Sequence, residues 1–184
     1  MRKLLLLLSL CCGVVFGEKE ALSCVLEVTR SDEARKGTLL YRLKSTLTYQ
    51  GPEQKMVSQN GTFELIAVTK DGTEIPTVFQ GADHYRRPVR SDFQKLQDGE
   101  KVTFRSGVVG YEKEGSWFLS WEDSLGGVHG CKLETLEGVK LVMKYSNETK
   151  KDVRLKVSET LTFVVLKKDI WKGATRSKAV SLVE

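Results

Sequence analysis

The most regular pattern along the chain is an alternation of apolar and polar residues with a period of two. It is clearest between residues 41 and 49, where polar residues separate Tyr41, Leu43, Leu47 and Tyr49. Side chains of an extended chain point alternately to opposite faces, so these four residues share one face. The pattern predicts a strand that buries this face and exposes the other.

Other short segments are rich in Val, Leu, Thr, Phe, Tyr and Trp, which favours strands. We interpret the following as strands: 22–29, 62–69, 101–105, 116–121, 139–145, 153–157, 161–166 and 178–183. Asn60-Gly61 and Asp71-Gly72 are typical of tight turns. Helical periodicity is weak, with one short turn expected within 31–36 and one within 135–138. The chain is therefore predicted to be all-β, an antiparallel sandwich of about 8–10 strands.

The beginning of the chain has the pattern of an export signal. Arg2 and Lys3 precede an apolar run of about 13 residues. Val15 and Gly17 stand at the −3 and −1 positions of a cut before Glu18. Charge, length and small residues together indicate a cleavable signal peptide.

A membrane anchor and a lipid-modified cysteine are the alternatives for this segment. An anchor needs about 20 apolar residues, and Leu10 before Cys11 is bulkier than the residue lipoprotein signals prefer. We expect a signal peptide over 1–17 and a single β-sandwich domain over 18–184. The protein is then secreted or extracytoplasmic, in the periplasm or at the cell surface of a bacterium, with no transmembrane segment after cleavage.

Composition and charge exclude several classes of protein. The 184 residues include 16 Gly and 3 Pro, which excludes collagen-like and low-complexity chains. The formal net charge of +5 falls to about +3 when the signal peptide is removed. This excess is too small to indicate a nucleic-acid partner.

The four cysteines divide between the signal peptide and the expected mature chain, where Cys24 and Cys131 remain. In an oxidising compartment the two are predicted to form one disulfide. The alternative is a pair of separate buried thiols. A redox-active pair is not indicated, because the mature chain has no C-x-x-C spacing.

Three segments carry a resemblance to a family. Residues 65–76 form a strand–turn–strand pattern, and residues 92–101 are close to a D-F-x-x-L-x-P-G-E connection, with Asp98 in place of the proline. Residues 171–180 follow the pattern W-x-G-x-x-x-S-x-x-V. Together they resemble uncharacterised secreted immunoglobulin-like β-sandwich domains. The resemblance implies the fold alone and assigns no catalytic or ligand residue.

Residues 80–98 have no clear period, and we expect a long surface connection there, of the kind that often carries function. Its densest basic and aromatic stretch supplies the candidate ligand-binding residues His84, Tyr85, Arg86, Arg87 and Arg90. Arginine presents planar pairs of donors suited to carboxylate, sulfate or phosphate groups. The alternative is ordinary solvated charge, as for the second basic cluster at 167–178.

Motifs for catalysis and cofactors are scarce. The two histidines, His84 and His129, have no G-x-S-x-G segment beside them. No metal-ligand spacing supports Asp83, His84 and Asp92, and no phosphate or dinucleotide motif occurs. We expect no catalytic residue, no metal site and no cofactor, although paired carboxylates for glycoside hydrolysis are left open.

Two further patterns have local interpretations. Trp117, Leu119 and Trp121 share a face of one strand, which favours core packing over a carbohydrate platform. Asn60 and Asn147 each begin an N-x-T sequon and are possible glycosylation sites in a eukaryote.

Taken together, the sequence predicts a secreted, non-enzymatic binding protein that uses the loops and sheet edges of a rigid sandwich. The expected partner is a protein or an anionic or polymeric ligand. The alternatives are an inhibitor of secreted hydrolases, with residues 80–92 inserted into a cleft, and a small carbohydrate-active enzyme.

Overall fold

A computed structural model describes residues 21–31, 37–58, 62–82, 89–123, 125–156 and 161–182. These residues form fifteen strands and one 3₁₀ turn, η1 (Arg90–Asp92), and contain no α-helix. The all-β prediction is confirmed, with more and shorter strands than expected. Within the described ranges, no helix is long and apolar enough to cross a membrane.

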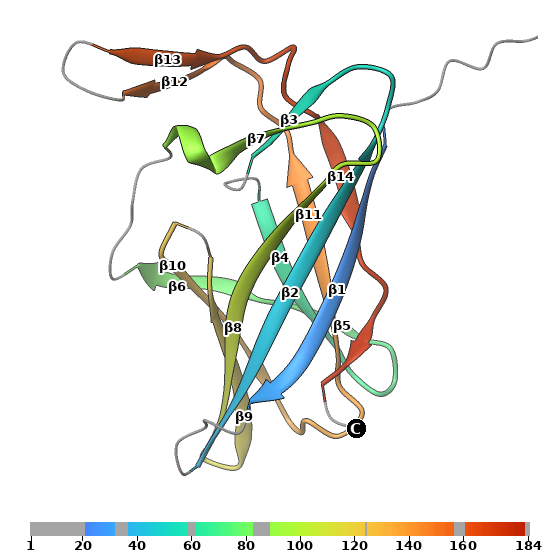
Figure 1. Ribbon diagram of the computed structural model, residues 1–184. Coiled ribbons are helices and arrows are strands. Elements are labelled where there is room, and N and C mark those ends of the chain that lie inside the picture. Colours follow the sequence, from blue (N-terminus) through green and yellow to red (C-terminus); the bar gives the residue numbers. More distant parts are fainter. Residues whose placement is uncertain are drawn as a thin grey trace, which may run out of the picture.

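The larger sheet has six strands in the order β1-β2-β8-β9-β10-β6, all antiparallel. Its strands are β1 (Ala21–Ser31), β2 (Thr38–Gln50), β8 (Lys101–Lys113), β9 (Ser116–Glu122), β10 (Gly127–Leu133) and β6 (Val78–Ala82). Figure 1 shows β1, β2 and β8 running side by side as long strands, while β10 and β6 cross at a different angle.

The second sheet has the order β14-β11-β4-β5, and a short strand, β15, also pairs with β11. Its strands are β14 (Gly173–Arg176), β11 (Lys140–Asn147), β4 (Thr62–Val68), β5 (Glu74–Pro76) and β15 (Val180–Ser181). Thr77 alone separates β5 from β6, so the chain passes there directly from one sheet to the other. On the opposite side β1 contacts β14 and β11.

Two antiparallel pairs of strands lie outside these sheets. They are β3 (Lys55–Ser58) with β7 (Phe93–Leu96), and β12 (Val153–Lys156) with β13 (Thr162–Val165). A parallel bridge from Met56 to Ile170 connects β3 to the segment that follows β13. Leu155, Val165 and Ile170 form a small core of their own in this part of the molecule.

The main core lies between the two large sheets. Tyr41, Leu43, Leu47 and Tyr49 all point into it, each 2% exposed or less, as the alternation in β2 predicts. The inward row of β9 is also confirmed: Leu119 and Trp121 are buried and Trp117 packs against the core. The opposite sheet contributes Leu65, Leu141, Met143 and Tyr145, among others.

The predicted disulfide is wrong: Cys24 and Cys131 are both free, buried thiols. Three strands separate β1 from β10 in the sheet order. At about 4.8 Å per strand the two residues are roughly 19 Å apart along the sheet, whereas a disulfide needs Cα atoms within about 7 Å. Cys24 Sγ instead lies 3.9 Å from the carbonyl oxygen of Met143 across the core.

The expected long connection over 80–98 is shorter than predicted. Residues 80–82 complete β6, residues 90–92 form η1, and residues 93–96 are β7. The short helical turn expected within 135–138 is absent, since these residues form a non-helical turn. The other expected helical turn, 31–36, lies outside the described residues except for Ser31, which ends β1.

Candidate functional site

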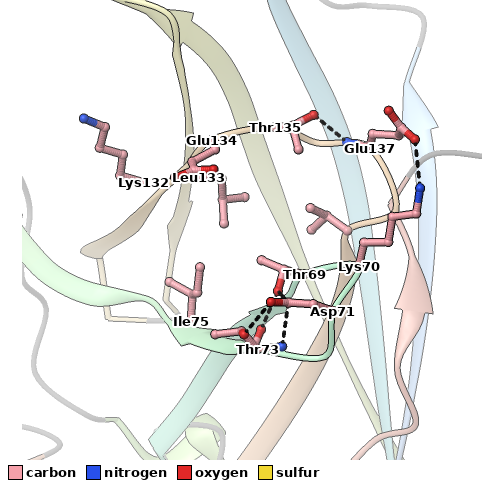
Figure 2. Close-up of a pocket in the computed structure, with 11 residues that line it drawn as sticks. Thr69, Lys70, Asp71, Thr73, Ile75, Lys132, Leu133, Glu134, Thr135 and Glu137 are labelled. Carbon is pink, nitrogen blue, oxygen red and sulfur yellow. Dashed lines mark hydrogen bonds and ion pairs between the residues drawn. The ribbon is translucent and has the colours of Figure 1, made fainter.

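A groove of about 690 Å³ lies at one end of the two sheets. One wall is the turn between β4 and β5, and the other is the connection from β10 to β11 (Figure 2). We name it the loop groove. It is lined by Thr69, Lys70, Asp71, Thr73, Ile75, Lys132, Leu133, Glu134, Thr135, Glu137 and Val139.

The β4–β5 wall is a tight turn held by Asp71. Gly72 has a φ of 90°, a left-handed conformation that glycine adopts without strain. The Asp71 carboxylate accepts hydrogen bonds from the Thr69 hydroxyl and from both the backbone N–H and the hydroxyl of Thr73. These bonds, led by that of Thr69, lower the pKa of Asp71. The carboxylate therefore stays ionised, and its hydrogen bonds stabilise the turn that the Asp71-Gly72 pair predicts.

The β10–β11 wall is anchored by buried residues. Leu136 and Val139 point into the core, and the Val139 N–H donates to the Leu136 carbonyl over 3.2 Å. Gly138 has a φ of 70°, and a Cβ there would lie 3.1 Å from Cβ of Lys70 on the opposite wall. The two walls therefore meet closely at Gly138, with the apolar floor of the groove beside this contact.

The rim of the loop groove carries charges of both signs. Lys70 and Glu137 join across it, with Nζ and Oε1 3.2 Å apart (Figure 2). Lys132 Nζ lies 6.0 Å from the centre of the Phe118 ring, at the outer limit of a cation–π contact. Glu134 has no hydrogen-bond or ionic partner among the described residues. One cation and one anion on this rim are thus free of ionic partners within the described structure.

A second polar cluster joins the end of β9 to β10. Nε2 of His129 lies 2.9 Å from Oδ2 of Asp123, and both side chains are largely buried. The N–H groups of Leu125 and Gly127 also donate to Asp123, over 2.8 and 2.9 Å. Burial raises the pKa of Asp123, but the hydrogen bonds from His129, Gly127 and Leu125 together outweigh it and leave the pKa lowered.

Aromatic rings enclose His129. Trp121 stacks on it with ring centres 5.1 Å apart, and Phe79 meets its edge at 5.6 Å. The indole N–H of Trp121 donates to the Thr77 hydroxyl, which donates to the Leu65 carbonyl. No serine or cysteine side chain hydrogen-bonds to His129 in the described part of the chain. The arrangement orients a histidine without supplying it a nucleophile.

Of the predicted ligand-binding residues, the structure describes one. His84, Tyr85, Arg86 and Arg87 lie outside the described residues. Arg90 is exposed in η1, and its guanidinium carbon lies 4.6 Å from the centre of the Phe163 ring. This cation–π contact joins η1 to β13, so Arg90 has a structural contact of its own.

The two sequons have different outcomes. Asn60 lies outside the described residues, whereas Asn147 is 6% exposed at the end of β11. Its Oδ1 accepts from the backbone N–H of Thr149, and its Nδ2 is buried without a partner. A glycan on Nδ2 would require this nitrogen to move out to solvent.

The loop groove was not predicted from the sequence. Its walls are far apart in the chain, and only the Asp71-Gly72 turn has a local signal. Across the described ranges, no three His, Cys, Asp or Glu side chains are placed to hold a metal ion. No protein-family model, curated protein or solved structure matches this chain.

Proposed function

We propose that the protein is a secreted, non-enzymatic binding module that holds an extended segment of a partner protein in the loop groove. The observation that carries this proposal is the meeting of two loops around an apolar floor with charges of both signs: the β4–β5 turn of the second sheet and the β10–β11 connection between the two sheets. Ligand sites typically combine an apolar lining with a few polar groups that fix orientation.

The lining favours a peptide over a small ion. The partly buried Ile75, with the buried Leu133 and Val139 beneath it, forms an apolar floor for one aliphatic side chain, and Lys132 and Glu134 can pair with one acidic and one basic side chain. A peptide with an acidic and a basic residue on either side of an apolar residue would complement these groups.

The walls also favour binding without rearrangement. Asp71 fixes one wall through three hydrogen bonds, and Val139 fixes the other through the core. A site that is formed before the ligand arrives loses little conformational freedom on binding, which favours affinity.

Secretion and membership of the immunoglobulin-like domains are further parts of this proposal. The first is supported by the charge and apolar pattern of residues 1–17, and the second by the three sequence segments described above. Both fit a binding module, because a sandwich can vary its loops while it keeps its core.

Selection from a random peptide library displayed on phage tests the proposal. Selected peptides are then titrated calorimetrically against the wild type, Glu134→Trp and Glu148→Trp. Glu134 is exposed on the groove rim, and Glu148 is equally exposed beyond the far end of β11. Both changes remove one carboxylate and add one indole, so their effects on solubility and charge match.

We expect the Glu134→Trp change to weaken binding at least tenfold, because the indole obstructs the groove and the carboxylate is lost. Glu148→Trp should bind as the wild type does. The proposal is overturned if the library yields no binding peptide, or if the selected peptides bind both variants with the affinity of the wild type.

A further inference from the structure

The six-stranded sheet is open over part of its length. β8 pairs with β9 from Val108 to Lys113 only, whereas residues 101–107 pair with β2 alone among the described residues. Beyond Glu122 the chain turns at Asp123 towards β10. Figure 1 shows β8 continuing past this point while β10 leads away to β6.

The opening leads to a second cavity of about 290 Å³, which we name the strand cleft. It is lined by Ser45, Phe63, Phe104, Arg105, Ser106, Gly107, Trp121, Glu122, Asp123 and Met143. It shares no residue with the loop groove. A ligand in the strand cleft therefore does not occupy the loop groove, where we propose that the peptide binds.

The inner walls of the strand cleft are aromatic and come from both sheets. Phe63 of β4 and Phe104 of β8 lie edge to face with ring centres 4.8 Å apart. Trp121 of β9 and Met143 of β11 complete the surface, and each is almost fully buried. Flat rings pack favourably against such walls, in stacked or edge-to-face geometry.

Two serine hydroxyl groups line the cleft. Ser45 is 3% exposed, and neither its hydroxyl nor that of Ser106 makes a hydrogen bond in the described structure. Ser45 stands opposite Phe104 in the β2–β8 pairing, so a hydroxyl lies directly beside an aromatic ring. Because Ser45 lines the cleft, its hydroxyl is available to hydrogen-bond a ligand there.

The mouth of the cleft is rigid. Asp123 stands at it, held by His129, Leu125 and Gly127. Because these bonds already occupy the carboxylate, Asp123 supports the opening rather than offering a free charge. Arg105 and Glu122 also line the cleft and are exposed, so the uncharged polar side chains left for a ligand among the lining residues are the two serine hydroxyls.

We propose that the strand cleft binds a small, neutral molecule with one aromatic ring and a hydroxyl or carbonyl group. The ring lies between Phe104 and Trp121, and the polar group hydrogen-bonds to Ser45. At about 30 Å³ per water molecule in the liquid, the cleft has the volume of roughly ten waters, which suits a molecule with a single ring. A ligand of this size binds with a dissociation constant of roughly 10 μM to 1 mM.

Titration of the ¹⁵N-labelled full chain with phenol, p-cresol and indole, followed by NMR, tests this site. Toluene serves as the matched probe that lacks a polar group. We expect saturable shifts of the Trp121 indole N–H and of the amides of Ser45 and Ser106. The site is overturned if no shift saturates, or if the shifts gather elsewhere, the loop groove included.

Three variants distinguish binding in the strand cleft from nonspecific binding elsewhere on the protein. Ser45→Ala should weaken p-cresol binding at least fivefold and leave toluene binding unchanged. Ser106→Phe should fill the cleft and weaken both at least tenfold, while Ser120→Phe, on the outer face of β9, should weaken neither. Equal binding of p-cresol by the wild type and Ser45→Ala contradicts the assigned hydrogen bond, and normal binding by Ser106→Phe contradicts the site itself.

Discussion

Oδ2 of Asp123 and Nε2 of His129 lie 2.9 Å apart and tie the turn after β9 to the strand that follows it. The same carboxylate accepts two backbone N–H groups within that turn. One side chain thereby fixes where the chain leaves the edge of β8. The opening of the six-stranded sheet depends on this local geometry.

Replacing Asp123 with Asn should destabilise the protein in a pH-dependent way. The pKa of Asp123 is lowered in the folded state, because the hydrogen bonds to its charged form outweigh the effect of burial. Its stabilisation is therefore complete above the unfolded-state pKa of about 3.9 and is lost as pH falls through the lower native value. Urea unfolding should show a loss of about 1–2 kcal/mol at pH 7.

The difference between wild type and Asp123→Asn should shrink as pH falls from 4 towards 2. His129 lies 2.9 Å from this carboxylate and Arg105 lines the same cleft, and both basic groups remain in the variant. Glu148→Gln, at an exposed position, is the control and should match the wild type throughout. A difference that grows on acidification would contradict the assignment.

Gly127→Ala should destabilise the same turn. A Cβ at position 127 would lie 2.6 Å from Oδ2 of Asp123, so the carboxylate must move and strain its hydrogen bonds. We expect a loss of about 1–3 kcal/mol in thermal or urea unfolding. Gly107→Ala is the matched control, since its nearest neighbours would be at ordinary contact distances of 3.7 and 3.8 Å. Equal stabilities of the two variants would argue against a close-packed turn.

Thr77→Val tests the hydrogen bond that links the two sheets at the β5–β6 crossing. The change keeps the shape but removes the acceptor of the Trp121 indole N–H, 2.9 Å away. A buried donor without a partner costs about 1–3 kcal/mol, measurable by urea unfolding. Thr29→Val, at an exposed position of β1, should lie within about 0.5 kcal/mol of wild type. A neutral Thr77→Val would show that the indole finds another acceptor.

The thiols of Cys24 and Cys131 should resist modification in the folded protein. Burial raises the pKa of each to about 11, which leaves almost no thiolate at neutral pH. Iodoacetamide should label neither residue in the native protein. After denaturation without reductant it should label both, and peptide mass mapping measures the labelling. If neither cysteine is labelled in the denatured state, the result would contradict free thiols and indicate a disulfide between them.

Local patterns predicted many of the strands, although not β3, β7 or β10, and several of their faces. The four apolar residues of β2 and the row of β9 follow from alternation, because burial of one face imposes a period of two. The Asp71-Gly72 turn follows from the conformational freedom of glycine and the hydrogen-bonding capacity of aspartate. Each of these features depends on residues close together in the chain.

Features that depend on strand order escaped prediction. The residues around Cys24 and Cys131 carry no signal that three strands separate β1 from β10 in the sheet. The disulfide prediction was wrong for that reason. Residues 80–82 of β6 fall in the connection predicted over 80–98, because that segment has no clear period, and the adjoining Val78 and Phe79 lie exposed at a sheet edge. The loop groove and the strand cleft both arise from strand pairing, which no single segment encodes.

Chemical-shift mapping of a library-selected peptide on the ¹⁵N-labelled chain tests the proposed binding function most directly. We predict that the largest backbone shifts fall at residues 69–75 and 132–139 and are absent in Glu134→Trp. Shifts confined to another face, such as the outer side of β2 and β8, would contradict the account and move the binding site away from the loops.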